Sequence, residues 1–301
     1  LVFFYPFVNM VCSLVNYDPA EGHAGAQKLS MVLAMFHTAF NVCNTFILIW
    51  FIPQMEKAVC RIIKMKRRDE DEDSRLRFIS SGIMQTPELS VLEARKEITL
   101  FAERIQRMFS MVRDLLETNN DADFAKLFAR IEKYESISDN MEIEIAKYLD
   151  NVSNAHLSDE TKAKIRVMLR EISEIESIGD SCYNIARSIN RKIKGKEDFT
   201  EEQYQHLHQM FSLTNDSIAQ MNVIISGRKD NLDVNRSFNI ENEINNYRTQ
   251  LKSQNINDVN DHKYTYAIGT MYMDIVSECE KLADYVVNVV EVHMGTRQRE
   301  A

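Results

Sequence analysis

Two pairs of acidic residues stand four positions apart in the second half of the chain, Glu176 with Asp180 and Glu280 with Asp284. Residues i and i+4 of an α-helix lie on one face one turn apart, so each pair can direct two carboxylates at one point. Carboxylates held so close repel each other unless a cation offsets the repulsion, and oxygen ligands suit hard or borderline metal ions. The spacing therefore predicts a metal site on each of two helices.

A second interpretation is that these carboxylates form ordinary ion pairs with basic residues of neighbouring helices, such as Arg170, Arg187 or Lys281. In the first interpretation, Asn184 and Asn288, one turn beyond each pair, could add a neutral ligand or a supporting hydrogen bond. On spacing alone both interpretations stay open.

Catalytic motifs point away from an enzyme. A di-iron site in a helical bundle needs Glu-x-x-His on two helices, and no glutamate of this sequence stands three residues before a histidine. The sequence also contains no Gly-rich phosphate loop, nucleophile elbow or kinase motif set. We therefore expect a protein that is not an enzyme. We expect five histidines to lie on the surface: His156, His206, His208, His262 and His293.

Long helices must position these acidic residues. No proline occurs in the 214 residues after Pro87, and glycine occurs there only five times. Apolar residues recur at three- and four-residue spacing, as at Ile98, Phe101, Ile105, Met108, Val112 and Leu115. We predict helices over 91–118, 122–152, 158–194, 200–226, 232–255 and 262–295. We expect Asp123, Ser158 and Thr200 to be N-caps, and Gly195 and Gly227 to lie near helix ends.

The six predicted helices repeat in two sets of three. The third and sixth align at an offset of 104, as Ser173-Glu174-x-Glu176-x-x-x-Asp180-x-x-x-Asn184 and Ser277-Glu278-x-Glu280-x-x-x-Asp284-x-x-x-Asn288. The first and fourth share Met108-Phe109-Ser110 and Met210-Phe211-Ser212. The second and fifth match more weakly, as Glu135-x-x-x-Asp139-Asn140 and Glu241-x-x-x-Asn245-Asn246. The repeat predicts two tandem three-helix bundles packed side by side, over about 91–195 and 196–296.

The first 53 residues differ from the rest in carrying almost no charge. Residues 29–52 run for 24 residues without a charged side chain, which predicts a transmembrane helix, and residues 1–15 read as part of a preceding one. Basic residues follow Pro53, so the positive-inside rule places residues 54–301 in the cytoplasm of a multi-pass plasma-membrane protein. Because the chain starts inside an apolar run, we expect the natural protein to continue upstream.

Three polar residues share one side of the predicted span: His37, Asn41 and Asn44. Polar groups in hydrocarbon face protein or water, so they predict either interhelical hydrogen bonds or the lining of a solute path. Residues 54–90 alternate basic and acidic runs, which predicts a solvated linker whose basic part can contact membrane lipids.

Overall charge and cysteine spacing exclude two further classes. A formal net charge of −9 disfavours nucleic acid as a partner, because no broad basic surface is available to displace counterions. The five cysteines form no Cys-x-x-Cys pair, so neither a disulfide framework nor a thiolate zinc site is predicted.

The duplicated Glu-x-x-x-Asp helices resemble the PhoU domain, a pair of three-helix bundles whose motif carboxylates can hold metal ions. The resemblance covers about residues 91–296. It implies an all-α fold and divalent or ferric metal ions as cofactors. It also implies that Glu135, Asp139 and Glu241 face the motif acids Glu176, Asp180, Glu280 and Asp284, with Asn245 standing where an acid is expected.

The sequence Phe36-His37-Thr38-Ala39-Phe40-Asn41-Val42 resembles the last membrane helix of bacterial type II sodium/phosphate cotransporters, which often carry a PhoU-like domain. This resemblance implies the C-terminal part of a sodium-dependent phosphate symporter with a regulatory or stabilising PhoU-like module. Sodium as coupling ion and phosphate would then bind upstream of Leu1. The alternative is a membrane-anchored signalling or scaffold protein of phosphate regulation, which binds a signalling protein partner. A homo-oligomer is compatible with both hypotheses.

Overall fold

The computed structural model describes residues 4–15, 26–62, 76–79, 86–154, 157–195, 198–227 and 233–300. These residues form eight helices: α1 (Phe4–Val15), α2 (Ala26–Ile62), α3 (Pro87–Glu117), α4 (Asp121–Ser153), α5 (Asp159–Lys194), α6 (Glu201–Ser226), α7 (Val234–Asn260) and α8 (Tyr266–Glu300). The prediction of an all-α fold is thus confirmed for the described residues. The chain divides into two compact units, residues 1–68 and 69–301.

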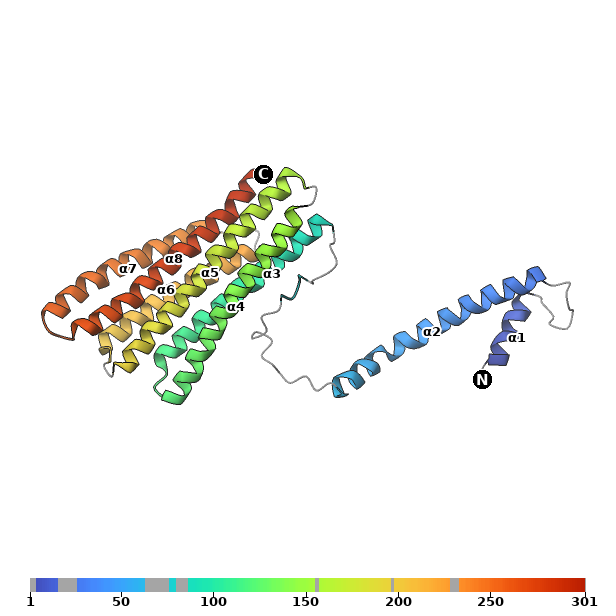
Figure 1. Ribbon diagram of the computed structural model, residues 1–301, viewed down its shortest axis with the longest axis horizontal. Helices are drawn as coiled ribbons and strands as arrows, with labels where there is room; N and C mark the ends of the chain where they lie inside the picture. The colour runs from blue at the N-terminus through green and yellow to red at the C-terminus, as the bar shows by residue number, and fades with distance from the viewer. Residues whose placement is uncertain are drawn as a thin grey trace. The chain divides into compact units, whose positions relative to one another are not determined.

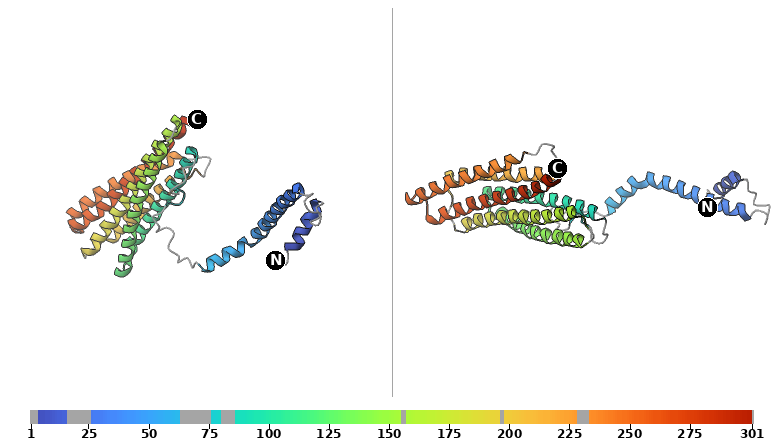
Figure 2. Two further views of the ribbon diagram at one scale, coloured as in Figure 1. Left: turned by 45° about the vertical axis from the view of Figure 1, so that its right-hand side comes forward. Right: turned by 90° about the horizontal axis from the view of Figure 1, so that it is seen from above.

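Helices α3 to α8 build the second unit as two three-helix bundles (Figures 1 and 2). In the first bundle α3 and α4 pack against α5, and in the second α6 and α7 pack against α8. Helices α5 and α8 share the most extensive contact and join the bundles, with a smaller contact between α3 and α6. The predicted pairing of two tandem bundles is therefore confirmed.

The apolar stripe predicted for the first helix of the repeat lies in the core. All six of its predicted positions, from Ile98 to Leu115, are 2% exposed or less. The repeated Met-Phe-Ser motif has a structural role, because the rings of Phe109 and Phe211 meet edge to face with centroids 5.7 Å apart. This contact lies where α3 packs against α6.

Helix ends follow the expected capping chemistry at several positions. Ser158 accepts a hydrogen bond from the Thr161 N–H, and Thr200 forms a capping box with Gln203, so both predicted N-caps are confirmed. The Asp123 prediction is wrong: Asn120 is the N-cap of α4. Its side chain accepts from two backbone N–H groups, which an asparagine does as well as an aspartate. Gly227 ends α6 with a left-handed φ of 62°.

Part of the predicted linker packs on the helical unit instead of being solvated. The Glu97 carboxylate, fully buried on α3, accepts hydrogen bonds from the backbone N–H groups of Arg77 at 3.0 Å and Phe78 at 2.8 Å. Leu76 and Ile79 pack against the core. The apolar residues between the charged runs therefore anchor residues 76–79.

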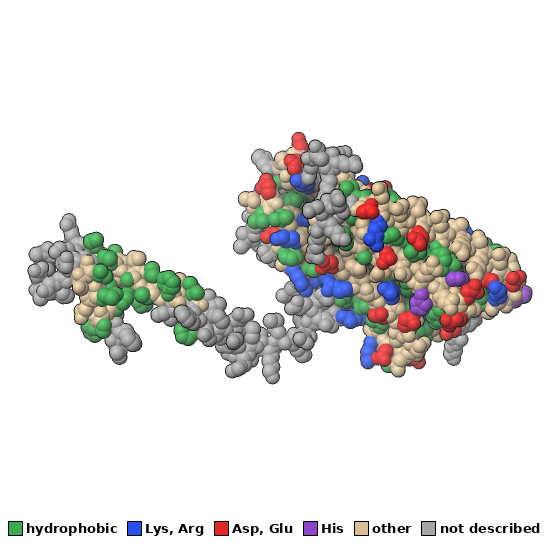
Figure 3. All heavy atoms as spheres, turned by 180° about the vertical axis from the view of Figure 1, so that it is seen from behind, with side chains coloured by type: hydrophobic (Ala, Val, Ile, Leu, Met, Phe, Trp, Pro, Cys, Tyr) green, Lys and Arg blue, Asp and Glu red, His purple; other side chains and the backbone are tan. Residues whose placement is uncertain are grey.

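The first unit consists of α1 and α2, which meet through the buried side chains of Val11, Cys12 and Val32. Figure 3 shows many hydrophobic side chains on the described surface of this unit, whereas acidic and basic side chains intermingle on the face shown of the helical unit. Phe46, for example, is 71% exposed.

Searching the described residues for membrane spans finds no helix that combines the necessary length and apolarity. The helix predicted over 29–52 does form, within α2, but its prediction as a transmembrane helix is wrong. Polar side chains lower the apolarity of this stretch, namely those of Ser30, His37, Thr38, Asn41 and Asn44. The predicted multi-pass plasma-membrane location, with residues 54–301 cytoplasmic, is contradicted with it.

Candidate metal centre in the first bundle

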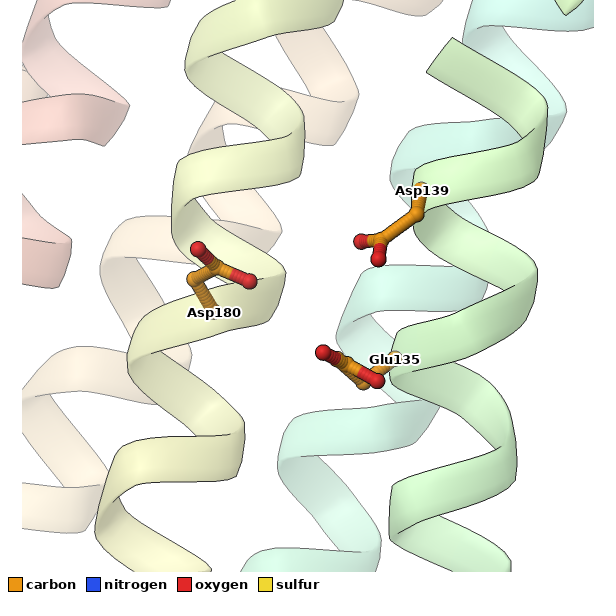
Figure 4. A group of neighbouring side chains, drawn as sticks. All are labelled: Glu135, Asp139 and Asp180. Carbon is orange, nitrogen blue, oxygen red and sulfur yellow. The ribbon is translucent and has the colours of Figure 1, made fainter. Parts of the chain in front are cut away.

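Three carboxylates converge between α4 and α5 of the first bundle. Glu135 and Asp139 lie one turn apart on α4, and Asp180 lies opposite them on α5 (Figure 4). One carboxylate oxygen from each residue lies within 4.8 Å of the others. Carboxylate oxygens at this separation can surround one cation. Geometry thus joins three of the seven predicted metal ligands.

A glycine brings the two helices together beside this cluster. A Cβ atom on Gly179 would lie 3.0 Å from both the Ile105 Cδ1 and the Ser138 Oγ atoms, which is closer than normal packing. A larger residue at this position would have to displace the Ile105 or Ser138 side chain, so glycine favours the close approach of α5 to α4. This close approach places Asp180 opposite Asp139.

The cluster carries negative charge at an energetic cost. Burial first, and then Asp139 and Asp180, raise the pKa of Glu135 above its ordinary value. Burial and Asp139 raise the pKa of Asp180. Glu176, one turn before Asp180 on α5, is affected most: burial, then Asp180, Glu142 and Asp139 raise its pKa to about 7. Each shift reports a carboxylate that lacks compensation for its charge.

Ion pairing does not supply that compensation. Within the described residues, no lysine, arginine or histidine forms an ion pair with Glu135, Asp139 or Asp180. Lys281, one of the predicted basic partners, pairs with Glu278 at 2.8 Å instead. The described residues of the first bundle therefore do not show the ion pairs that this interpretation predicts.

The second bundle places the equivalent acids between α7 and α8 but neutralises part of their charge. Arg248 Nε lies 3.7 Å from Glu280 Oε2, and the Asn245 side-chain amide donates a hydrogen bond to Glu241. Burial and then Asp284 raise the pKa of Glu241. Burial also raises the pKa of Asp284, whereas Arg248 acts to lower it. The second bundle therefore contains an ion pair of the predicted type, but its basic residue is Arg248 and not Arg170, Arg187 or Lys281.

The same alignment that relates Glu135 to Glu241 explains the difference, because its offset of 106 relates Asp139 to Asn245 and Glu142 to Arg248. The first bundle therefore gathers five acids at these positions, with Glu176 and Asp180, and the second gathers three acids and one arginine. Sequence reasoning missed Glu142 and Arg248 because it stopped the comparison one turn early. Extending the alignment by three residues would have found them.

Sequence reasoning also missed a buried polar group centred on Glu171. Glu171 on α5 is fully buried and accepts hydrogen bonds from Arg95 on α3 and, if the ring is protonated at Nδ1, from His293 on α8 at 2.8 Å. His293 is 8% exposed, so its prediction as a surface residue is wrong. His208 is exposed, as predicted, and its Nε2 atom lies 2.9 Å from Glu117 Oε1. His156 lies outside the described residues.

The predicted solute-path residues lie elsewhere. His37, Asn41 and Asn44 are all exposed on α2 and take no part in the buried contact between α1 and α2. Their role was predicted from a membrane span that the described residues do not support.

Comparison with known proteins finds a similarity to the PhoU domain within this unit. Residues 98–189 match the family model of the PhoU domain. Two curated proteins from two strains of Streptococcus pneumoniae, each described as a phosphate-specific transport system accessory protein PhoU homolog, are 25% identical over 124 residues. The match covers 41% of this chain and 56% of each relative, so the chain spans about half the length of the curated relatives it matches.

A solved structure shares the fold. The crystal structure of the phosphate transport system regulatory protein PhoU from Streptococcus pneumoniae matches with a TM-score of 0.60 at 18% identity, covering 71% of this chain and 97% of that chain. The all-helical fold described above is therefore PhoU-like. Nothing in these comparisons shows the sodium/phosphate cotransporter family.

Proposed function

We propose that this chain is a PhoU-like regulatory or accessory protein of phosphate transport. The observation that carries the proposal is the PhoU match over residues 98–189, which contains the whole acidic cluster of the first bundle from Glu135 to Asp180. The curated relatives are named as accessory proteins of phosphate-specific transport, and the similar solved structure is titled a regulatory protein. A fold alone would not assign a function, so the shared segment with its cluster is the stronger support.

We propose further that the first bundle holds one hard metal ion. Glu135, Asp139 and Asp180 would supply the ligands, and Glu176, one turn away, could join them after losing its proton. An all-carboxylate donor set fits Mn²⁺, Mg²⁺, Ca²⁺ or ferric iron better than a thiophilic metal. The raised pKa values of these acids support the proposal, because a bound cation would stabilise the charges that the folded chain leaves uncompensated.

The role we propose is binding and regulation, not catalysis. A metal ion would pull α4 and α5 together at the point where Gly179 already allows close approach. Metal release would leave three mutually repelling carboxylates there, which favours separation of the two helices. We propose that a protein of the phosphate transport system senses this change in packing.

Deleting the chain from its source organism tests the proposal. We expect phosphate uptake, or its response to external phosphate, to change on deletion and to recover with the wild-type chain. A chain carrying Glu135→Gln and Asp180→Asn should fail to restore the response, whereas the matched second-bundle chain with Glu241→Gln and Asp284→Asn should restore it. Unchanged uptake and unchanged phosphate sensitivity on deletion would refute the regulatory function.

A further inference from the structure

A polar cleft with a volume of about 380 Å³ lies between α5 and α8 and is separate from the acidic cluster. Helix α5 contributes Asn184, Arg187 and Arg191 to its lining, and α8 contributes Asp274, Ser277 and Lys281. The cleft therefore spans the contact that joins the two bundles.

The internal repeat supplies a natural comparison for this cleft. At the offset of 104, Asn184 and Glu278 correspond to Asn288 and Glu174. Asn288 donates a hydrogen bond to Glu174 at 3.0 Å across α5 and α8. In the cleft, Glu278 bonds to Lys281 at 2.8 Å. Asn288 and Glu174 thus form a hydrogen bond between α5 and α8, whereas the corresponding residues, Asn184 and Glu278, line a cleft.

Basic residues distinguish the cleft from its counterpart. The positions related to Arg187, Arg191 and Lys281 are Glu291, Gly295 and Ser177, none of which is a cation. At the position related to Asp274 the counterpart carries Arg170, so the cleft has three positive charges and its counterpart has one. A purely structural contact would not require this.

Two of the three cations have acidic partners. Arg191 Nη2 donates to Asp274 Oδ2 at 2.8 Å, and the two side chains are 59% and 42% exposed. Lys281 pairs with Glu278, and its side chain is 55% exposed. The Arg191–Asp274 pair is exposed and therefore weak. Glu278 is only 17% exposed, but the Lys281 side chain is open to solvent, so a ligand with greater charge could compete for both cations.

Arg187 is the third cation of the cleft lining. Its guanidinium lies 5.9 Å from the centroid of the Tyr183 ring. Within the described residues it forms no ion pair with any carboxylate. With three basic and two acidic side chains, the cleft carries one excess positive charge. An anion would balance it.

We propose that this cleft binds a phosphate-type oxyanion, with Arg187 as its anchor. A guanidinium presents paired N–H donors that match two oxygens of a tetrahedral oxyanion. Lys281 and Arg191 would add charge, and the Asn184 amide and Ser277 hydroxyl would add neutral donors. The occupied site would link α5 of the first bundle to α8 of the second. This site is distinct from the proposed metal centre and does not depend on it.

Isothermal titration of the metal-free chain in the presence of EDTA tests the proposal, since chelation prevents phosphate from binding through a metal ion. Inorganic phosphate and glycerol 3-phosphate serve as separate probes, which distinguishes a free anion from a phosphomonoester. We expect at least one probe to bind saturably, with one ion per chain and a dissociation constant below about 10 mM. Arg187→Gln should weaken that binding by about tenfold or more.

Arg170→Gln is the matched control, because Arg170 is an exposed arginine on the same helix and lies outside the cleft lining. It should leave the affinity within about twofold. Lys281→Gln is a second test and should also weaken binding, while thermal unfolding followed by circular dichroism confirms that each variant is folded. Failure of both probes to bind, or equal affinity in the wild type and Arg187→Gln, would overturn the proposal.

Discussion

The two bundles of the helical unit place acids at equivalent positions but treat their charge differently. In the first, Glu135, Asp139 and Asp180 converge, and no basic side chain of the described part of the chain forms an ion pair with them. In the second, Arg248 lies beside Glu280, and Asn245 replaces an acid and bonds to Glu241. Two substitutions on one helix thus separate a candidate metal centre from a partly neutralised ion-pair network, while the helices around both remain the same.

This difference shows what the duplicated fold does and does not determine. The repeat positions a carboxylate pair on α5 and on α8, and packing brings a second helix opposite each pair. Whether a cation is needed there depends on a few side chains, and the fold accommodates both the acidic set of the first bundle and the partly neutralised set of the second. The chemistry can therefore be exchanged between the bundles by mutation.

The largest expected effect is a loss of metal affinity when the first bundle is given the residues of the second. Asp139→Asn with Glu142→Arg removes one ligand and places a cation beside the rest. We expect Mn²⁺ affinity, measured by electron paramagnetic resonance titration, to fall by about 100-fold or more. Glu144→Arg, an exposed position on the same helix, should leave the affinity within about threefold. Equal losses in the two variants would mean that only overall charge matters.

The reverse exchange should create a site. Asn245→Asp with Arg248→Glu gives the second bundle the acids of the first, so the same titration should detect two Mn²⁺ ions per chain in place of one. Because the second bundle has Ala283 where the first has Gly179, the helices cannot approach as closely, and the new site should be weaker. A stoichiometry that stays at one would show that side-chain identity alone does not create the site.

Stability of the metal-free chain should depend on pH through Glu176. Its pKa is about 7 in the folded chain and ordinary in the unfolded chain, so the folded state binds the proton more tightly. The free energy of unfolding should therefore fall as pH rises from about 5 to about 7. Urea unfolding across this range measures the slope. Glu176→Gln should flatten it, whereas the second-bundle counterpart Glu280→Gln should not. A stability that rises over this range would contradict the assignment.

The close approach of α4 and α5 predicts the smallest effect. Gly179→Ala introduces a Cβ atom 3.0 Å from Ile105 Cδ1 and Ser138 Oγ, and this overpacking should lower the free energy of unfolding by about 1–3 kcal/mol. Gly295→Ala is the control, because nothing lies within 4 Å of its new atom. That variant should be neutral or slightly more stable. Similar urea midpoints for the two variants would show that Gly179 does not set the distance between the helices.

The fold was largely predictable because the composition, the apolar periodicity and the internal repeat all indicate the same helices. Proline is absent after Pro87, the stripe from Ile98 to Leu115 has helical period, and the repeat relates one set of three helices to the next. Ser158 and Thr200 then cap helices as their side chains allow. Asn120 was missed since several polar residues near it could cap equally well.

The site was only partly predictable. Spacing alone identified Asp180, and the PhoU resemblance added Glu135 and Asp139, but neither revealed which bundle lacks compensating charge. That property depends on contacts between helices, such as Arg248 with Glu280. His293 was misjudged for the same reason, because burial near a helix end is decided by the neighbouring helices. The membrane prediction failed within the described residues, where polar side chains such as those of Asn41 and Asn44 interrupt the uncharged stretch.

The number of metal ions that the wild-type chain binds decides whether the first bundle is a metal centre. The chain is stripped with chelator, dialysed, titrated with Mn²⁺ by electron paramagnetic resonance, and compared with the Asp180→Asn and Asp284→Asn variants. We expect one strong site in the wild type and in Asp284→Asn, and none in Asp180→Asn. Two equal sites, no site, or a site lost only in Asp284→Asn would contradict the claim that the first bundle is the metal centre.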